Sequence, residues 1–101
     1  MSGKTDFRTD QKFSELVKEP GRYLIVLHND NYTTMEFVVS VLKEVFHKSS
    51  IEANVIMLEV HKKGAGKVGS YTYDIAATKM YQVENMASRA GYPLKCTMEK
   101  E

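Results

Sequence analysis

The feature that most constrains the fold is a continuous apolar run at residues 23–27, which reads Tyr-Leu-Ile-Val-Leu. Its length and its β-branched and aromatic content are typical of a strand that is buried on both faces, or nearly so. Pro20 and Gly21 precede it and favour a turn, because proline biases its predecessor away from helix and glycine tolerates turn dihedral angles. The sequence therefore predicts a folded core over residues 20–101. Residues 1–19, which carry many charges of both signs, are expected to form a flexible N-terminal extension.

A helix is predicted to follow the polar loop at residues 29–32. Thr33 and Glu36 have the spacing of a capping box, in which each side chain accepts a hydrogen bond from the other residue's main chain. Apolar residues then recur at three- and four-residue spacing, which places one apolar face along about four turns. The residues of this face are Met35, Val38, Val39, Leu42, Val45 and Phe46.

Residues 51–63 could form either a helix or a strand, because the apolar residues 55–58 alone are compatible with a buried strand. The ends of the segment favour a helix. Ser49 and Glu52 form a second capping-box pattern, and Gly64 can adopt the left-handed conformation that closes a helix. Lys62 and Lys63 suit the negative end of the helix dipole. We therefore predict a helix here.

The remaining elements follow from similar signals. Residues 68–71 are predicted to form a short strand, and Thr72 is predicted to cap a third helix that ends before Gly91 and Pro93. Residues 94–98 form the last predicted strand. The order is β-α-α-β-α-β, which implies a single small α+β domain with helices packed on a three-stranded antiparallel sheet. The apolar face of the third helix comprises Ile75, Ala76, Met80, Val83, Met86, Ala87 and Ala90.

Composition excludes several classes of function. The chain has 101 residues, 43% of them hydrophobic, which supports one compact domain. Its 14 Lys and Arg residues nearly balance its 13 Asp and Glu residues, so no nucleic-acid partner is predicted. The single cysteine, Cys96, cannot form an intramolecular disulfide and suits a reducing compartment such as the cytosol. No apolar stretch approaches the roughly 20 residues that span a bilayer, so no membrane partner is expected.

Three apparent motifs have simpler explanations. Residues 64–69 match the glycine fingerprint of dinucleotide sites, but a predicted helix precedes them where that site needs a strand, so we interpret them as a flexible turn. His28, His47 and His61 lack a paired spacing for zinc, and neither a metal nor a cofactor is predicted. The six methionines are more typical of adaptable core filler than of a pocket, although a pocket lining stays open.

Several motifs in the chain resemble the ClpS family, the adaptors of the bacterial Clp protease that recognise N-degrons. The resemblance covers about residues 20–101, and the motifs occur in the family's order without gaps. They are residues 29–33, residues 35–39, residues 56–58 with Val60 and His61, Tyr71 with Thr72, Ala76, Thr78 with Lys79, and residues 92–94 with Cys96. The family's β-α-α-β-α-β fold agrees with the order predicted above.

The resemblance implies an adaptor, not an enzyme, that binds N-terminal Leu, Phe, Tyr or Trp and delivers its cargo to a Clp AAA+ unfoldase-protease. A free α-ammonium group beside a hydrophobic side chain requires acceptor atoms beside an apolar socket. The α-amino ligands implied by the family match are Asn29, Asn31 and His61. Asp30 and Thr33 are implied to hold the peptide backbone. The implied socket residues are Met35, Val38, Met57, Val60 and Leu94, with Met35 at the rim as a gatekeeper against β-branched side chains.

A second surface is implied on the third helix. Asp74 and Lys79 match positions that dock the N-terminal domain of a Clp unfoldase of the ClpA or ClpC type, and residues 1–19 match an extension that assists delivery. The resemblance also implies a monomer in the bacterial cytosol or the plastid stroma.

Two residues depart from the family pattern. Asn31 replaces the usual aspartate, so a formal charge is missing and weaker amine capture is expected. Thr34 replaces a proline at the expected first helical position, where a small effect is expected with Thr33 still in place as the cap.

Two rival functions remain open. One is a purely structural module, because the order of elements also resembles the C-terminal domain of a ribosomal stalk protein and fold alone does not settle function. The other is a small hydrolase that uses His61 with Asp30, since catalytic groups meet in space rather than in sequence order.

Overall fold

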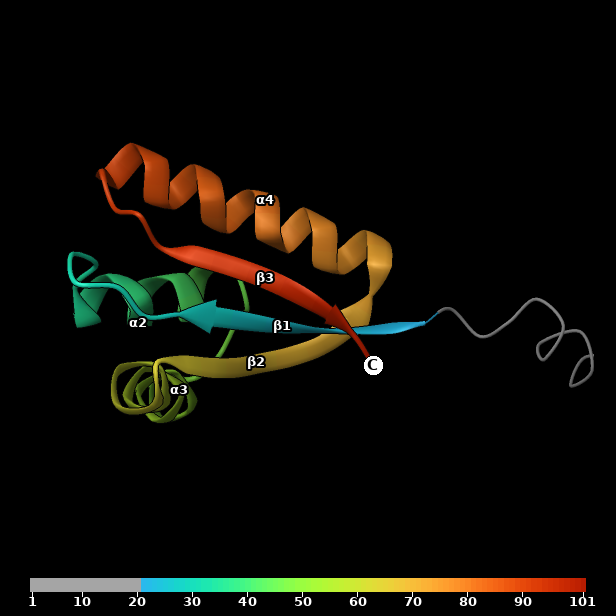
Figure 1. Ribbon diagram of the computed structural model, residues 1–101, viewed down its shortest axis with the longest axis horizontal. Helices are drawn as coiled ribbons and strands as arrows, with labels where there is room; N and C mark the ends of the chain where they lie inside the picture. The colour runs from blue at the N-terminus through green and yellow to red at the C-terminus, as the bar shows by residue number, and fades with distance from the viewer. Residues whose placement is uncertain (1–20) are drawn as a thin grey trace, which may run out of the picture.

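The computed structural model describes residues 21–101, so the predicted N-terminal extension lies outside the described part of the chain. The elements follow the predicted order, β-α-α-β-α-β (Figure 1). They are β1 (Arg22–His28), α2 (Met35–Glu44), α3 (Ser50–Lys63), β2 (Ala65–Thr72), α4 (Tyr73–Ala90) and β3 (Lys95–Lys100). The predicted α+β fold class is confirmed.

The three strands form one antiparallel sheet in the order β2-β1-β3, with β1 in the centre. This position explains the continuous apolar run, because Ile25, Val26 and Leu27 are all buried. The pairing of β1 with β2 is irregular between Ile25 and Val26, whose partners are Gly69 and Lys67. Val68, between those partners, is buried in the core.

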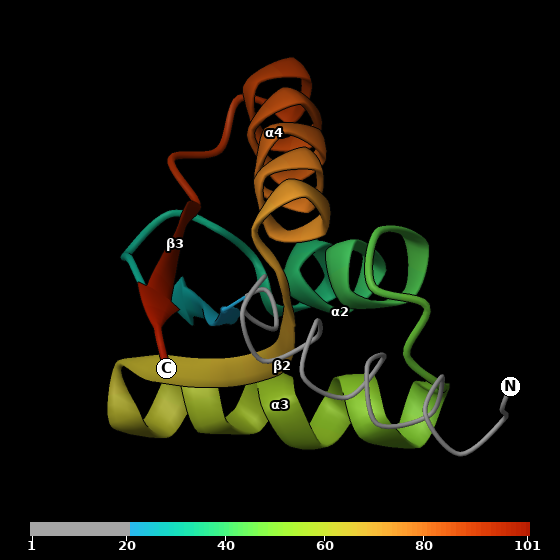
Figure 2. The same cartoon turned by 90° about the vertical axis from the view of Figure 1, so that its right-hand side faces the viewer.

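The helices and the sheet share one hydrophobic core. Figure 2 shows α3 running along β2, with α2 between α3 and α4 in this view. Ile25 and Leu27 of β1 belong to the same buried cluster as Val38 of α2, Val60 of α3 and Val83 of α4. The core therefore includes residues from the central strand and from all three helices.

The start of α2 differs from the prediction by one residue. Thr34, not Thr33, is the N-cap, and its hydroxyl oxygen accepts a 3.1 Å hydrogen bond from the main-chain N–H of Phe37. The predicted capping box of Thr33 with Glu36 is therefore wrong, because the Thr33 hydroxyl and N–H both donate to Asp30. The helix also ends at Glu44, so Val45 and Phe46 are buried just beyond it.

The disputed second helix is confirmed together with its end signals. The Ser49 hydroxyl oxygen accepts from the N–H of Glu52, and the Glu52 carboxylate accepts from the N–H of Ser49. Gly64 closes α3 in the left-handed conformation, with φ of 88°. This conformation is open to glycine because glycine has no Cβ atom.

The turn predicted at residues 64–69 is wrong, because β2 begins at Ala65. Gly66 lies in that strand directly against α3, and a Cβ atom at this position would lie 2.7 Å from Cγ2 of Val60. The glycine therefore permits close packing of strand on helix.

The last two elements differ in detail from the prediction. Thr72 is the N-cap of α4, but its side chain makes no capping hydrogen bond, and Gly91 ends the helix. Ile75 and Ala90, predicted on the apolar face, are exposed. The strand β3 starts one residue after the predicted Leu94 and extends to Lys100.

Candidate functional site

The polar turn between β1 and α2 is organised by the carboxylate of Asp30. One oxygen accepts hydrogen bonds of 2.7 Å from the main-chain N–H groups of Tyr32 and Thr33, and the other accepts one of 2.7 Å from the Thr33 hydroxyl. Partial burial alone would raise the pKa of Asp30. The hydrogen bonds from Thr33 and Tyr32 outweigh it, and the pKa lies below its ordinary value. The charged carboxylate thus holds the turn in one conformation.

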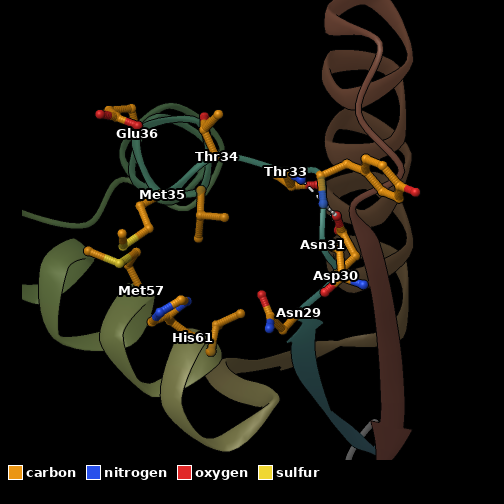
Figure 3. Close-up of a pocket in the computed structure, with 12 residues that line it drawn as sticks. Asn29, Asp30, Asn31, Thr33, Thr34, Met35, Glu36, Met57 and His61 are labelled. Carbon is orange, nitrogen blue, oxygen red and sulfur yellow. Dashed lines mark hydrogen bonds between the residues drawn. The ribbon is translucent and has the colours of Figure 1, made fainter.

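A cavity of about 470 Å³ lies between this turn, α2 and α3. Figure 3 shows Met35 of α2 and Met57 of α3 side by side at one end of it, and Asn29 at the other. Val38 and Val60 at the cavity are almost completely buried, whereas Met35 is 47% exposed at the rim. The residues that line the cavity are Asn29, Asp30, Asn31, Tyr32, Thr33, Thr34, Met35, Glu36, Val38, Met57, Val60 and His61.

The polar lining suits a cation or another hydrogen-bond donor. The lining side chains include the carboxylates of Asp30 and Glu36 but no lysine or arginine. Asn29, Asn31 and His61 are exposed at the cavity and offer amide oxygens and an imidazole nitrogen. The cavity therefore combines acceptor atoms and negative charge with an apolar floor.

Residues 18–97 of the chain match the family model described as "ATP-dependent Clp protease adaptor protein ClpS". The chain belongs to the ClpS family. This identification confirms the resemblance inferred from the motifs, and the family is one of protease adaptors.

Named relatives match over most of the chain. The ATP-dependent Clp protease adapter protein ClpS of Acetivibrio thermocellus is 54% identical over 101 residues, which is 100% of each chain. The protein of the same name from Syntrophus aciditrophicus is 52% identical over 89 residues, covering 88% of this chain and 83% of the relative.

A solved structure of the family shares the fold. It is that of Agrobacterium tumefaciens ClpS2 bound to L-phenylalaninamide, with a TM-score of 0.79 and 38% sequence identity. The match covers 82% of this chain and 100% of that one.

Most of the site residues expected from the ClpS resemblance line this single cavity. All three expected α-amino ligands, both expected backbone ligands and four of the five expected socket residues are there. The exception is Leu94, which is 6% exposed and packs in the hydrophobic core rather than lining the cavity. Its place in the socket stays a prediction.

Three residues that line the cavity are not among the site residues expected from the sequence: Tyr32, Thr34 and Glu36. Tyr32 and Thr34 alternate with expected site residues along the turn, so their position was a usable signal. Glu36 was assigned to a capping box instead.

The suggested pairing of His61 with Asp30 finds no support in the hydrogen bonds of the turn. Both residues line the cavity, but the hydrogen bonds of the Asp30 carboxylate join it to Tyr32 and Thr33. A catalytic pair needs the base within hydrogen-bond reach of its partner.

Asp74 and Lys79 lie on α4, away from the cavity lining. Asp74 is exposed in the first turn. The Lys79 ammonium group donates a 2.8 Å hydrogen bond to the carbonyl of Val45 and lies 5.7 Å and 5.6 Å from the ring centroids of Phe46 and Tyr71. Lys79 thus joins α4 to the segment that follows α2.

Within residues 21–101, no group of three or more His, Cys, Asp or Glu side chains is placed to hold a metal ion. None of the described helices is both long and apolar enough to cross a membrane.

Proposed function

We propose that this ClpS-family protein binds other proteins by an N-terminal Leu, Phe, Tyr or Trp and delivers them to a Clp AAA+ unfoldase-protease. The observation that carries the proposal is one cavity that combines an apolar floor with acceptor atoms and carboxylates at its edge. An N-terminal residue differs from every internal residue by its α-ammonium group, and such an edge can distinguish the two.

The ligand of the related ClpS2 supports the proposal that the cavity binds an N-terminal residue. L-phenylalaninamide has a free amino group, a benzyl side chain and an amide in place of the carboxylate, as an N-terminal phenylalanine has within a protein. That structure is of a relative that shares 38% of its residues with this chain. In the proposed complex, Asn29, Asn31 and His61 hold the α-ammonium group.

The rest of the ligand meets the turn and the socket. Asp30 and Thr33 lie beside the peptide backbone, and Asp30 also keeps the turn in place through its own hydrogen bonds. Burial of a Leu or Phe side chain contributes about 1.5–3 kcal/mol. The resulting affinity is modest, on the order of micromolar, which suits a carrier that must release its cargo. The proposed socket comprises Met35, Val38, Met57, Val60 and Leu94.

The test is a titration of fluorescent peptides that differ only in the first residue, each with an N-acetylated control. We expect peptides that begin with Leu, Phe, Tyr or Trp to bind and those that begin with Ser to fail. Acetylation should weaken binding by at least about tenfold, since it removes the charge and two donors. If the acetylated peptides bind equally well, amine recognition is wrong and a structural module becomes the better account.

Delivery requires a second surface, and we assign it to α4. Asp74 and Lys79 dock the N-terminal domain of the unfoldase in this proposal. Asp74 is the better residue to test, because a Lys79 variant would also lose the hydrogen bond to Val45. The charge reversal Asp74→Lys should slow degradation of a reporter with N-terminal Phe while leaving the affinity for the free peptide unchanged. Glu84→Lys, exposed on the same helix, is the matched control.

The protein has no catalytic activity of its own in this proposal. Incubation with peptide and ester substrates should give no turnover in the absence of the protease. Turnover that the variant His61→Ala abolishes would instead support a hydrolase.

A further inference from the structure

A second hollow of about 420 Å³ adjoins the first between α2 and α3. It shares Met35, Glu36 and Met57 with the first cavity, so both methionine side chains border both spaces. In Figure 3, Glu36 lies on the far side of Met35 from His61. The remaining lining residues are Val39 and Asn54.

The polar side chains of this hollow are those of Glu36 and Asn54. Glu36 contributes an exposed carboxylate. One N–H of the Asn54 amide donates a 2.8 Å hydrogen bond to the carbonyl of Ser50, so its second N–H and its amide oxygen can both bind a ligand. The other lining side chains, Met35, Val39 and Met57, are apolar. Because Glu36 brings a negative charge to an otherwise uncharged lining, a ligand group with an apolar stem and a cationic end complements this hollow.

Lysine and arginine side chains have that combination, because their aliphatic stems pack on apolar surface while the charged head stays in contact with water or an anion. Aspartate and glutamate have the opposite character and would place like charge beside Glu36. The position of the hollow also restricts which residue can reach it. In an extended peptide, alternate side chains point to the same side, so the third side chain follows the first on one face at a distance of about 7 Å.

We propose that this hollow is a subsite for the third residue of the bound N-terminal segment and that it selects lysine or arginine there. The side-chain stem lies over Met35, Val39 and Met57, and the cationic end meets the Glu36 carboxylate and the Asn54 amide oxygen. This inference rests on the proposed function, because the first cavity must hold the N-terminal residue for the third residue to reach the second hollow.

The test uses fluorescent peptides that begin with Phe-Ser and carry Lys, Ser or Glu at position three. A second set carries the same residues at position two, and every peptide has an N-acetylated control. At 0.15 M salt the Debye length is about 8 Å, so a distant charge contributes little. We expect Lys at position three to bind about threefold more tightly than Ser, and Glu about threefold more weakly, as for a partly exposed ion pair.

Variants at Glu36 test whether this carboxylate is responsible. Glu36→Gln should reduce the Lys-to-Ser affinity ratio to about one, and Glu36→Lys should reverse the preference in favour of Glu. Glu44→Gln removes the same charge from the last turn of the same helix, outside both hollows, and should keep the ratio. The Lys-to-Ser affinity ratio is compared instead of the absolute affinity, because Glu36 also lines the first cavity and its substitution can change the binding of every peptide.

The outcomes separate the two proposals. If unacetylated Phe peptides bind and acetylated ones do not, but the third residue has no effect or its effect persists in Glu36→Gln, the subsite is wrong while N-terminal recognition stands. An equal Glu36-dependent gain from Lys at position two would overturn the assignment to the third residue. If free and acetylated peptides behave alike, both proposals fall.

Discussion

The main-chain N–H of Asn29 donates a 2.9 Å hydrogen bond to the main-chain carbonyl of Gly64. Asn29 directly follows β1, and Gly64 closes α3 in a left-handed conformation. This bond joins the end of the central strand to the helix turn that carries His61. The bond thereby restrains the relative position of Asn29 and His61, two residues from distant parts of the chain that are proposed to hold the same ammonium group.

The first prediction concerns the missing charge at Asn31. The substitution Asn31→Asp should tighten binding of a peptide that begins with Phe or Leu, because a charged acceptor holds an ammonium group more strongly than an amide does. The gain is about 1 kcal/mol, or about fivefold in affinity. Fluorescence anisotropy measures it, with Asn85→Asp on α4 as the control for added charge. An affinity equal to or below that of the native protein would rule out this role for Asn31.

The second prediction concerns the rim residue Met35. The variant Met35→Ala should admit peptides that begin with Ile or Val, because it removes bulk beside the β-carbon of the ligand. We expect the affinity ratio of an Ile peptide to a Leu peptide to rise on the order of tenfold. Leu58→Ala is the matched control, since Leu58 has a similar exposure of 43% but does not line the cavity. An unchanged ratio in Met35→Ala would remove Met35 from the selection of the first residue.

The third prediction compares two threonine caps. Thr34 accepts a capping hydrogen bond and Thr72 does not, although each occupies the N-cap of its helix. Thr34→Ala should lower the free energy of unfolding by about 1 kcal/mol. Thr72→Ala should change it by much less. Urea denaturation of both variants checks the difference, and equal losses would contradict the assignment of the cap to the Thr34 side chain.

The fourth prediction follows from the lowered pKa of Asp30. The hydrogen bonds to its carboxylate favour the charged form in the folded state, so their contribution is fully present above the ordinary pKa of about 3.9. It is lost as the pH falls through the lower folded-state pKa. The variant Asp30→Asn should therefore be less stable than the native protein at pH 5–7, and the difference should shrink below about pH 4. Urea denaturation over a pH series measures this, and a difference that does not vary with pH would contradict it.

The order of the elements could be predicted from the sequence because it depends on local patterns, whereas the cavity residues were expected only from the resemblance to the ClpS family. The second helix illustrates this point. Its apolar residues are compatible with either a helix or a strand. The helix is indicated by its two ends, where Ser49 and Glu52 form a capping box and Gly64 adopts a left-handed conformation.

What could not be predicted depends on side-chain contacts that are made only in the folded structure. Thr33 and Thr34 are adjacent and chemically identical, but the Thr33 hydroxyl donates to Asp30 whereas the Thr34 hydroxyl oxygen caps α2. Gly66 was mistaken for part of a turn because its role depends on Val60 across the helix–strand contact. Leu94 and Glu36 show the same limit. Leu94 packs in the core and Glu36 lines the cavity, and both outcomes depend on how the elements pack together.

Met35 and Met57, which border both hollows, bear on the range of N-terminal side chains that the proposed site can hold. Both side chains are unbranched and turn easily about their own bonds. Rotation of the two methionine side chains can make room for either an aromatic ring or the branched end of leucine, without a shift of the α2 or α3 backbone. In the proposed complex, one chain thus accepts ring-shaped and branched side chains through rotations of two methionines, without movement of a lid.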